Sequence, residues 1–128
     1  MEVGQVVRIS GTGEELQKAH IHIVIGHNNE NAYLVPISSV GYKWRVDKTC
    51  LLCASDGIPG ITKNSFVFYG RSKIVRNDRS SEVLAQLSGE LLSRIIAGVA
   101  KSSETPDHIR RAFVPPEAPR RVLAARED

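Results

Sequence analysis

The sequence lacks the long apolar runs of membrane proteins and the many cysteines of small secreted ones. No stretch approaches the roughly 18 consecutive apolar residues of a membrane-spanning helix, and the first residues carry no charged segment followed by an apolar one. Two cysteines among 128 residues are too few for a disulfide framework. We therefore expect a cytoplasmic protein that makes no membrane contact and keeps both cysteines as thiols.

The common signatures of catalysis and nucleotide binding are also missing. The sequence contains no G-x-S-x-G elbow, P-loop, dinucleotide fingerprint or H-E-x-x-H motif. What is present is ordinary for a globular chain, with 41% apolar and 24% charged residues. A chain of this length has room for one compact domain.

Short runs with strand character fill the first part of the chain, and turn-rich segments separate them. The runs cover residues 4–9, 19–25, 32–37, 49–54, 65–69 and 72–75. Five or six short strands at this spacing predict a small β-barrel.

After Arg76 the apolar spacing changes to three and four residues, which is typical of one helix face. The apolar residues in this pattern are Val83, Leu84, Leu87, Leu91, Leu92, Ile95, Ile96 and Val99. Because Ser88 is a good N-cap and glycine is a poor interior residue, we predict a short helix followed by a longer one, with a single long helix as the alternative. A last short helix is predicted to begin at Pro106, with Thr105 as its N-cap.

The predicted fold class is therefore mainly β with C-terminal helices. We expect a barrel over residues 1–78 and a helical appendage over 79–114, packed on the barrel in the same domain. A mobile tail rich in proline and arginine is expected over 115–128.

The positive charge is concentrated between residues 40 and 76. This segment contains seven Lys or Arg residues and only two Asp residues. Phosphate backbones attract such a surface, and Tyr42, Trp44 and Tyr69 are aromatic residues on which unpaired bases can stack. An ordinary solvated surface explains the same charges, so both interpretations stay open.

His20 and His22 are two residues apart in the run over 19–25, so both side chains point to one face of the predicted strand. The isoleucines of that run fill the opposite face and must meet the core. We therefore expect both imidazoles on the outer or cleft side, where a side chain with a pKa near neutrality can move a proton. The alternative is a pair of structural histidines in the barrel wall.

Cys50 and Cys53 have C-x-x-C spacing, and together with His20 and His22 they offer a Cys₂His₂ zinc set. The two leucines between the cysteines favour a strand, which would turn the thiols to opposite faces. We therefore expect buried structural thiols and no bound metal, with zinc binding and redox chemistry as alternatives.

A glycine-rich loop follows these cysteines. Asp56-Gly57 and Pro59-Gly60 suit tight turns, and the next residues, Thr62 to Ser65, carry hydroxyl, ammonium and amide donors. Such a loop can hold a phosphate, or it can be a plain connection between strands.

Taken in order, several motifs resemble those of the MazF/PemK/Kid-like toxin superfamily. They are Gly4-Gln5-Val6-Val7, His20-Ile21-His22-Ile23-Val24-Ile25, Val35-Pro36-Ile37-Ser38-Ser39, and Ser65-Phe66-Val67-Phe68-Tyr69 leading into Lys73-Ile74-Val75. The likeness covers residues 3–76 and implies an SH3-like barrel. It also implies the toxin of a type II toxin–antitoxin system: a metal-independent hydrolase without a cofactor that cleaves single-stranded RNA, acts as a cytoplasmic homodimer and is neutralised by an antitoxin peptide.

The resemblance also implies which residues carry the reaction. The catalytic Arg of the family falls on His20, and its catalytic Thr or Ser falls on Ser38. His20 departs from the family pattern, yet a histidine can shuttle a proton and, when protonated, stabilise charge; His22 is the second candidate for proton transfer. The residues expected to bind RNA are Trp44, Arg45, Lys48, Lys63, Arg71 and Lys73.

A different class of function stays open beside the endoribonuclease. In this alternative the barrel is a non-catalytic module whose basic surface holds a nucleic acid or a partner protein. Binding with a steep salt dependence and no turnover is typical of such a module.

Overall fold

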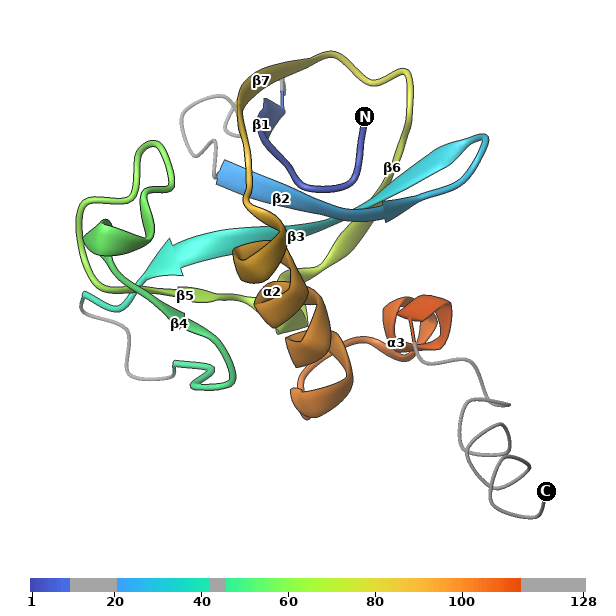
Figure 1. Cartoon of the computed structure of the whole chain (residues 1–128). Coiled ribbons are helices and arrows are strands. Elements are labelled where there is room, and N and C mark those ends of the chain that lie inside the picture. Colours follow the sequence, from blue (N-terminus) through green and yellow to red (C-terminus); the bar gives the residue numbers. More distant parts are fainter. Residues whose placement is uncertain (10–20, 42–45, 114–128) are drawn as a thin grey trace, which may run out of the picture.

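The structure is a computed structural model that describes residues 1–9, 21–41 and 46–113. Within these residues, seven strands form one antiparallel sheet and two α-helices follow it (Figure 1). The strands are β1 (Gln5–Ile9), β2 (Ile21–His27), β3 (Asn31–Ser39), β4 (Leu51–Leu52), β5 (Ser65–Val67), β6 (Lys73–Arg76) and β7 (Ser81–Gln86), and the helices are α2 (Gly89–Lys101) and α3 (Asp107–Phe113). The prediction of a mainly β chain with C-terminal helices is confirmed.

The longest strand, β3, organises the sheet, whose order is β4-β5-β3-β2-β1-β7. One edge of β3 pairs with β2, while the other edge pairs first with β6 and then, towards its C-terminal end, with β5. The end strands β4 and β7 are not paired with each other in the described part of the chain, so the sheet observed there is open.

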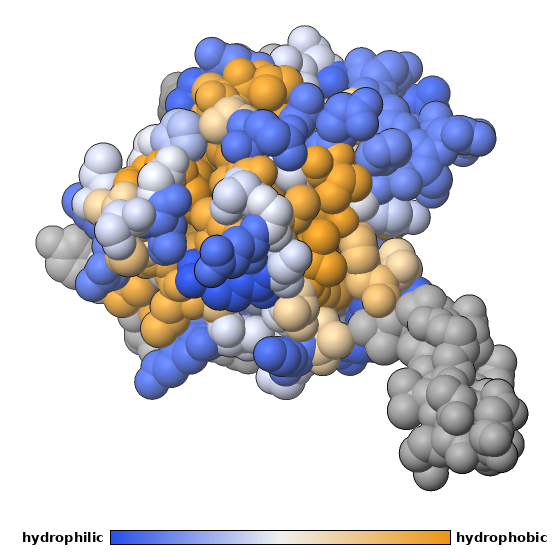
Figure 2. Space-filling view, in the orientation of Figure 1, coloured by the Kyte–Doolittle hydropathy of each residue, from blue (hydrophilic) through white to orange (hydrophobic). Residues whose placement is uncertain are grey.

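The main core lies between the sheet and α2, which crosses in front of β3 and β5 in Figure 1. Its buried members include Ile23, Ile25, Val35 and Val67 from the strands and Ile95 from the helix. Figure 2 shows apolar side chains along the flanks of α2 and a hydrophilic outer face, as expected for a helix with one face on a core.

Tyr69 joins the helix to the sheet. It begins the 3₁₀ turn η2 (Tyr69–Arg71), is fully buried, and donates its hydroxyl hydrogen to the backbone oxygen of Ile95 at 2.5 Å. Burial, and next the neighbouring Cys50 thiol, raise the pKa of Tyr69, so the phenol stays a protonated donor. A Cβ at position 98 would collide with the Tyr69 hydroxyl, which explains the glycine in the middle of α2.

A second apolar cluster covers the opposite face of the sheet. Its buried residues are Val7, Ile9, Val24, Ala32, Leu34 and Val75. Val6 and Ile23 belong to the main core, whereas their chain neighbours Val7 and Val24 belong to the second cluster. The middle parts of β1 and β2 are therefore buried on both faces, as their apolar residues allow.

The short helix predicted over Val83 to Leu87 is wrong, because these residues belong to β7 and to the turn after it. β7 pairs antiparallel with β1, where Val6 faces Ala85 and Val7 faces Val83. Leu84 is the extra residue of a bulge, and such an insertion makes the apolar spacing resemble that of a helix. The strand-rich part therefore extends beyond residue 78, to Gln86.

The positions of the two α-helices in the described residues agree with the prediction. Ser88 is the N-cap of α2, and its hydroxyl accepts a hydrogen bond from the Leu91 backbone nitrogen at 3.3 Å. α3 follows Pro106 as predicted, but the buried Thr105 hydroxyl has no hydrogen-bond partner among the described residues, so capping by this side chain is wrong. None of the helices in the described ranges is both long and apolar enough to cross a membrane.

The phenol-to-glycine contact yields a stability prediction. In Gly98→Ala the new methyl group must push Tyr69 or α2 out of position, and we expect the free energy of unfolding to fall by about 1–3 kcal/mol. Urea denaturation followed by circular dichroism measures this change. Ser93→Ala, at an exposed position of the same helix, is the matched control and should not lose stability. An unchanged unfolding free energy in Gly98→Ala would contradict the proposed role of this contact.

Candidate functional site

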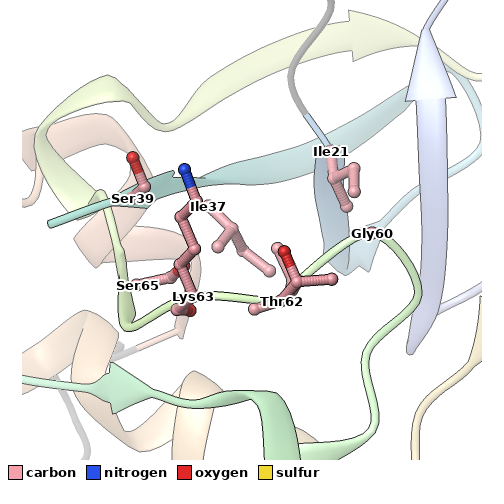
Figure 3. A pocket seen from close by; sticks show the side chains of 8 residues that line it. Ile21, Ile37, Ser39, Gly60, Thr62, Lys63 and Ser65 are labelled. Carbon is pink, nitrogen blue, oxygen red and sulfur yellow. The ribbon is translucent and has the colours of Figure 1, made fainter. Parts of the chain in front are cut away.

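An open pocket of about 330 Å³ lies where the C-terminal end of β3 meets the loop before β5. Apolar side chains of Ile21, Ile37 and Ile61 contribute one part of its lining. The polar part consists of Ser39, Thr62, Lys63 and Ser65, shown as sticks in Figure 3. No carboxylate is among the described residues that line it.

The loop that forms one wall of the pocket is held by a tight turn. Ile58 is buried in the main core, and the Ile61 backbone nitrogen donates to the Ile58 oxygen at 3.0 Å. Pro59 and Gly60 occupy the central positions of this turn, and the φ of +83° at Gly60 is the one that a type II turn requires. A Cβ at Gly60 would also meet Cδ1 of Ile21 at 2.5 Å, so only glycine lets the loop approach the start of β2.

The hydroxyl groups of the pocket come from both sides of a strand pair. Ser39 and Ser65 are directly opposite each other in β3 and β5, which places them on one face of the sheet. The Ser65 hydroxyl donates to the Lys63 backbone oxygen at 2.9 Å and so holds the turn that presents the lysine. In Figure 3 the Lys63 ammonium group and the hydroxyl groups of Ser39 and Thr62 project to the same side of the pocket.

This set of groups suits an anion. Hydroxyl groups donate hydrogen bonds to phosphate oxygens, and an ammonium group adds charge without demanding one fixed geometry. Among the described residues no acidic side chain pairs with Lys63, so its charge is available to a ligand. The prediction that the loop after Gly60 can hold a phosphate is compatible with this pocket.

Ser38, the predicted catalytic serine, lies on the face of the sheet opposite to Ser39. It is opposite Phe66 in β5 and only 8% exposed. Its neighbour Ser39 was not singled out by sequence reasoning, although it is the serine that lines the pocket. The alternation of side chains along a strand was the signal that separates them, because it sends adjacent residues to opposite faces.

His22 is buried, with 5% of its surface exposed, so the prediction of an outer or cleft position is wrong for this residue. It lies on the face of Val24, and that face is covered by the second apolar cluster. Alternation correctly separated the histidine from the isoleucines, but it cannot show that both faces are covered. His20, the other predicted catalytic histidine, lies outside the described residues.

The predicted RNA-binding residues do not gather at one point. Lys48, Lys63, Arg71 and Lys73 are all exposed, and of these four only Lys63 lines the pocket. The guanidinium group of Arg71 lies instead over the ring of Phe68. Trp44 and Arg45 lie outside the described residues.

Asp47 connects the positively charged segment, residues 40–76, to the helices. The sequence did not predict this structural role of Asp47. Its buried carboxylate accepts hydrogen bonds from the Ser102 hydroxyl at 2.6 Å and from the Thr49 backbone nitrogen at 2.9 Å. Burial alone would raise the pKa of Asp47, but these hydrogen bonds outweigh it and hold the pKa below the ordinary value. Ser102 in turn accepts from Arg110 of α3 through its backbone oxygen, at 2.6 Å.

The two cysteines are free thiols in different surroundings. Cys50 is buried in the main core, as expected, whereas Cys53 is partly exposed and its sulfur lies 2.9 Å from the Ser55 hydroxyl oxygen. The residues covered by the structure contain no group of three or more His, Cys, Asp and Glu side chains that could hold a metal ion. Because His20 lies outside those residues, the zinc alternative stays untested.

The Asp47 hydrogen bonds yield a pH prediction. A carboxyl group whose pKa is lower in the folded state contributes stability above its unfolded pKa, near 4, and loses it as the pH falls through the folded pKa. Asp47→Asn should therefore cost about 1–3 kcal/mol of unfolding free energy at pH 7 and clearly less at pH 3. Urea denaturation at both pH values tests this, with the exposed Asp78→Asn as the control. An equal cost of Asp47→Asn at both pH values would show that charge is not the cause.

Comparison with known proteins adds no family to these observations. No protein-family model matches the sequence, and none of the curated proteins matches it. The likeness of the strand motifs to MazF/PemK/Kid-like toxins therefore remains an expectation, and function is inferred from the pocket, the serines at the end of β3 and the exposed cations.

Proposed function

We propose that this chain binds single-stranded RNA and cleaves it without a metal ion, as a toxin of a type II toxin–antitoxin system built on an SH3-like barrel. The observation that carries the proposal is the pair of serines at the end of β3. Ser39 lines a pocket with Lys63, and Ser38, on the opposite face, occupies the position to which the MazF/PemK/Kid resemblance assigns catalysis.

The pocket supports binding of an RNA backbone. A phosphodiester carries one negative charge and two non-bridging oxygens, which match an ammonium group and nearby hydroxyl donors. Exposed cations at Lys48, Arg71 and Lys73 add a longer-range attraction that does not depend on base sequence. Together they suit a flexible strand that touches several points of the surface.

The proposed reaction is an attack of the ribose 2′-oxygen on the adjacent phosphorus atom. A base takes the 2′-hydroxyl proton, the bond to the 5′-oxygen breaks, and an acid gives that oxygen a proton, leaving a 2′,3′-cyclic phosphate and a 5′-hydroxyl end. His20 is the proposed proton-transfer residue, because the neighbouring candidate His22 is only 5% exposed. Ser38 is proposed to donate a hydrogen bond to a non-bridging oxygen.

We propose that the working unit is a homodimer in the cytoplasm and that an antitoxin peptide neutralises it. Trp44 and Arg45, four and three residues before Lys48, are proposed to extend the RNA-binding surface.

RNA cleavage in EDTA tests the enzyme. The purified full chain should convert a labelled single-stranded RNA into shorter products, and a variant with His20→Ala and Ser38→Ala should lose at least about a hundredfold in rate, the usual contribution of a general acid or base. Ser81→Ala, in β7, is the control. Undiminished cleavage by the double variant would contradict the assignment of His20 and Ser38 to the active site. The absence of cleavage by the unmodified chain would contradict the proposal that the protein is an enzyme.

A non-catalytic binding module is the second candidate function. It is favoured by the burial of Ser38. Only 8% of the surface of this residue is exposed to an incoming strand. In this case the chain should bind RNA with an affinity that falls steeply with salt, yet yield no shorter products.

A further inference from the structure

The side chains of Phe68 and Arg71 form a cation–π contact on the surface. The guanidinium carbon of Arg71 lies 5.5 Å from the centre of the Phe68 ring. The Phe68 ring is half-buried and rests on Phe66, with 5.1 Å between the ring centres, while Arg71 is exposed. The outer surface of this pair is therefore an exposed guanidinium group that rests on the Phe68 ring.

The backbone under this pair is held at several points. Phe68 donates its backbone N–H to Pro36 in β3 at 2.9 Å, and the Arg71 backbone nitrogen donates to the Phe68 oxygen at 3.0 Å. Tyr69, between them, is anchored under α2, and the Ser72 hydroxyl donates to the Tyr69 oxygen at 2.7 Å. The two side chains thus stand on a short 3₁₀ turn whose position is set by the main core.

The pair belongs to the same part of the sheet as Ser38. Phe66 is directly opposite Ser38 across β3 and β5, so these two side chains share a face, and Phe66 contacts Phe68. If an RNA phosphate lies at Ser38, as proposed, the Phe68–Arg71 pair lies on the β5 side of that phosphate, beyond the buried Phe66.

We infer that Arg71, supported by Phe68, is a stacking platform for one unpaired nucleobase of the RNA and does not act as a phosphate clamp. A guanidinium group is planar and weakly hydrated, so its free face stacks well on a base. No carboxylate among the described residues pairs with Arg71. This inference rests on the proposed binding of single-stranded RNA and adds the group of the RNA that is recognised at this point.

The test compares two probes that differ only in their bases. One is a short fluorescent 2′-O-methyl RNA strand, which lacks the 2′-hydroxyl needed for cleavage, and the other is the same backbone with abasic sites. Binding to the full chain is measured by fluorescence anisotropy over a range of salt concentrations. The variants are Arg71→Lys, which keeps the charge and loses the plane, and Phe68→Leu, which keeps an apolar support and loses the ring; Lys101→Ala, an exposed cation on α2, is the control.

Stacking predicts that Arg71→Lys weakens binding of the base-bearing strand by about tenfold. The affinity for the abasic strand and the salt dependence should stay unchanged, because the charge is kept. Phe68→Leu should show the same selectivity, and Lys101→Ala should bind both strands as the unmodified chain does.

Other results would contradict either the role of Arg71 or RNA binding itself. If the unmodified chain binds both strands and Arg71→Lys binds them equally well, or weakens both to the same extent, Arg71 is no stacking platform, while RNA binding stands. If the unmodified chain binds neither strand, the proposed function fails, and the inference fails with it. Because Arg71 is exposed, Arg71→Lys keeps the test decisive even if Phe68→Leu does not fold.

Discussion

The seating of Tyr69 beneath α2 is the contact on which the other parts of this structure depend. Its phenol reaches the backbone oxygen of Ile95, and the glycine at position 98 leaves room for the ring, because a Cβ there would collide with the Tyr69 hydroxyl. The same residue ends the stretch that begins with β5 and opens the turn before β6. One buried side chain thus sets the distance between helix and sheet and, from the same turn, the position of Phe68 and Arg71 on the outside.

The two apolar clusters explain why the candidate site lies at strand ends. Strands β1 and β2 have no face left for a ligand in their middle parts, because one cluster covers each face. Polar side chains gather where the loop before β5 meets the end of β3, and Ser39, Lys63 and Ser65 come together there. Ser38 is separated from them by the sheet itself, so the proposed RNA contacts on the two sides would require a strand that bends around the end of β3.

Much of the local structure could be predicted because it depends on neighbouring residues. Ser88 caps α2 since its hydroxyl reaches a backbone nitrogen three residues later, and Pro59-Gly60 forms a turn since their own backbone angles favour it. The pocket was harder to predict. Its loop was identified by the hydrogen-bond donors in its sequence. The contribution of Ser39, however, depends on the register between β3 and β5, and no single segment of the sequence predicts that register.

The sequence by itself determined where most strands lie, where α2 begins and which part of the chain carries the excess positive charge, because alternation, capping and composition act locally. Only the tertiary structure decided that Val83 and Leu84 belong to a strand and that His22 is buried. In both cases the deciding partner is distant in the sequence. β1 supplies the hydrogen-bonding edge that makes β7 a strand. The second apolar cluster covers the face of β2 that carries His22, and the alternation of side chains could not predict this cover.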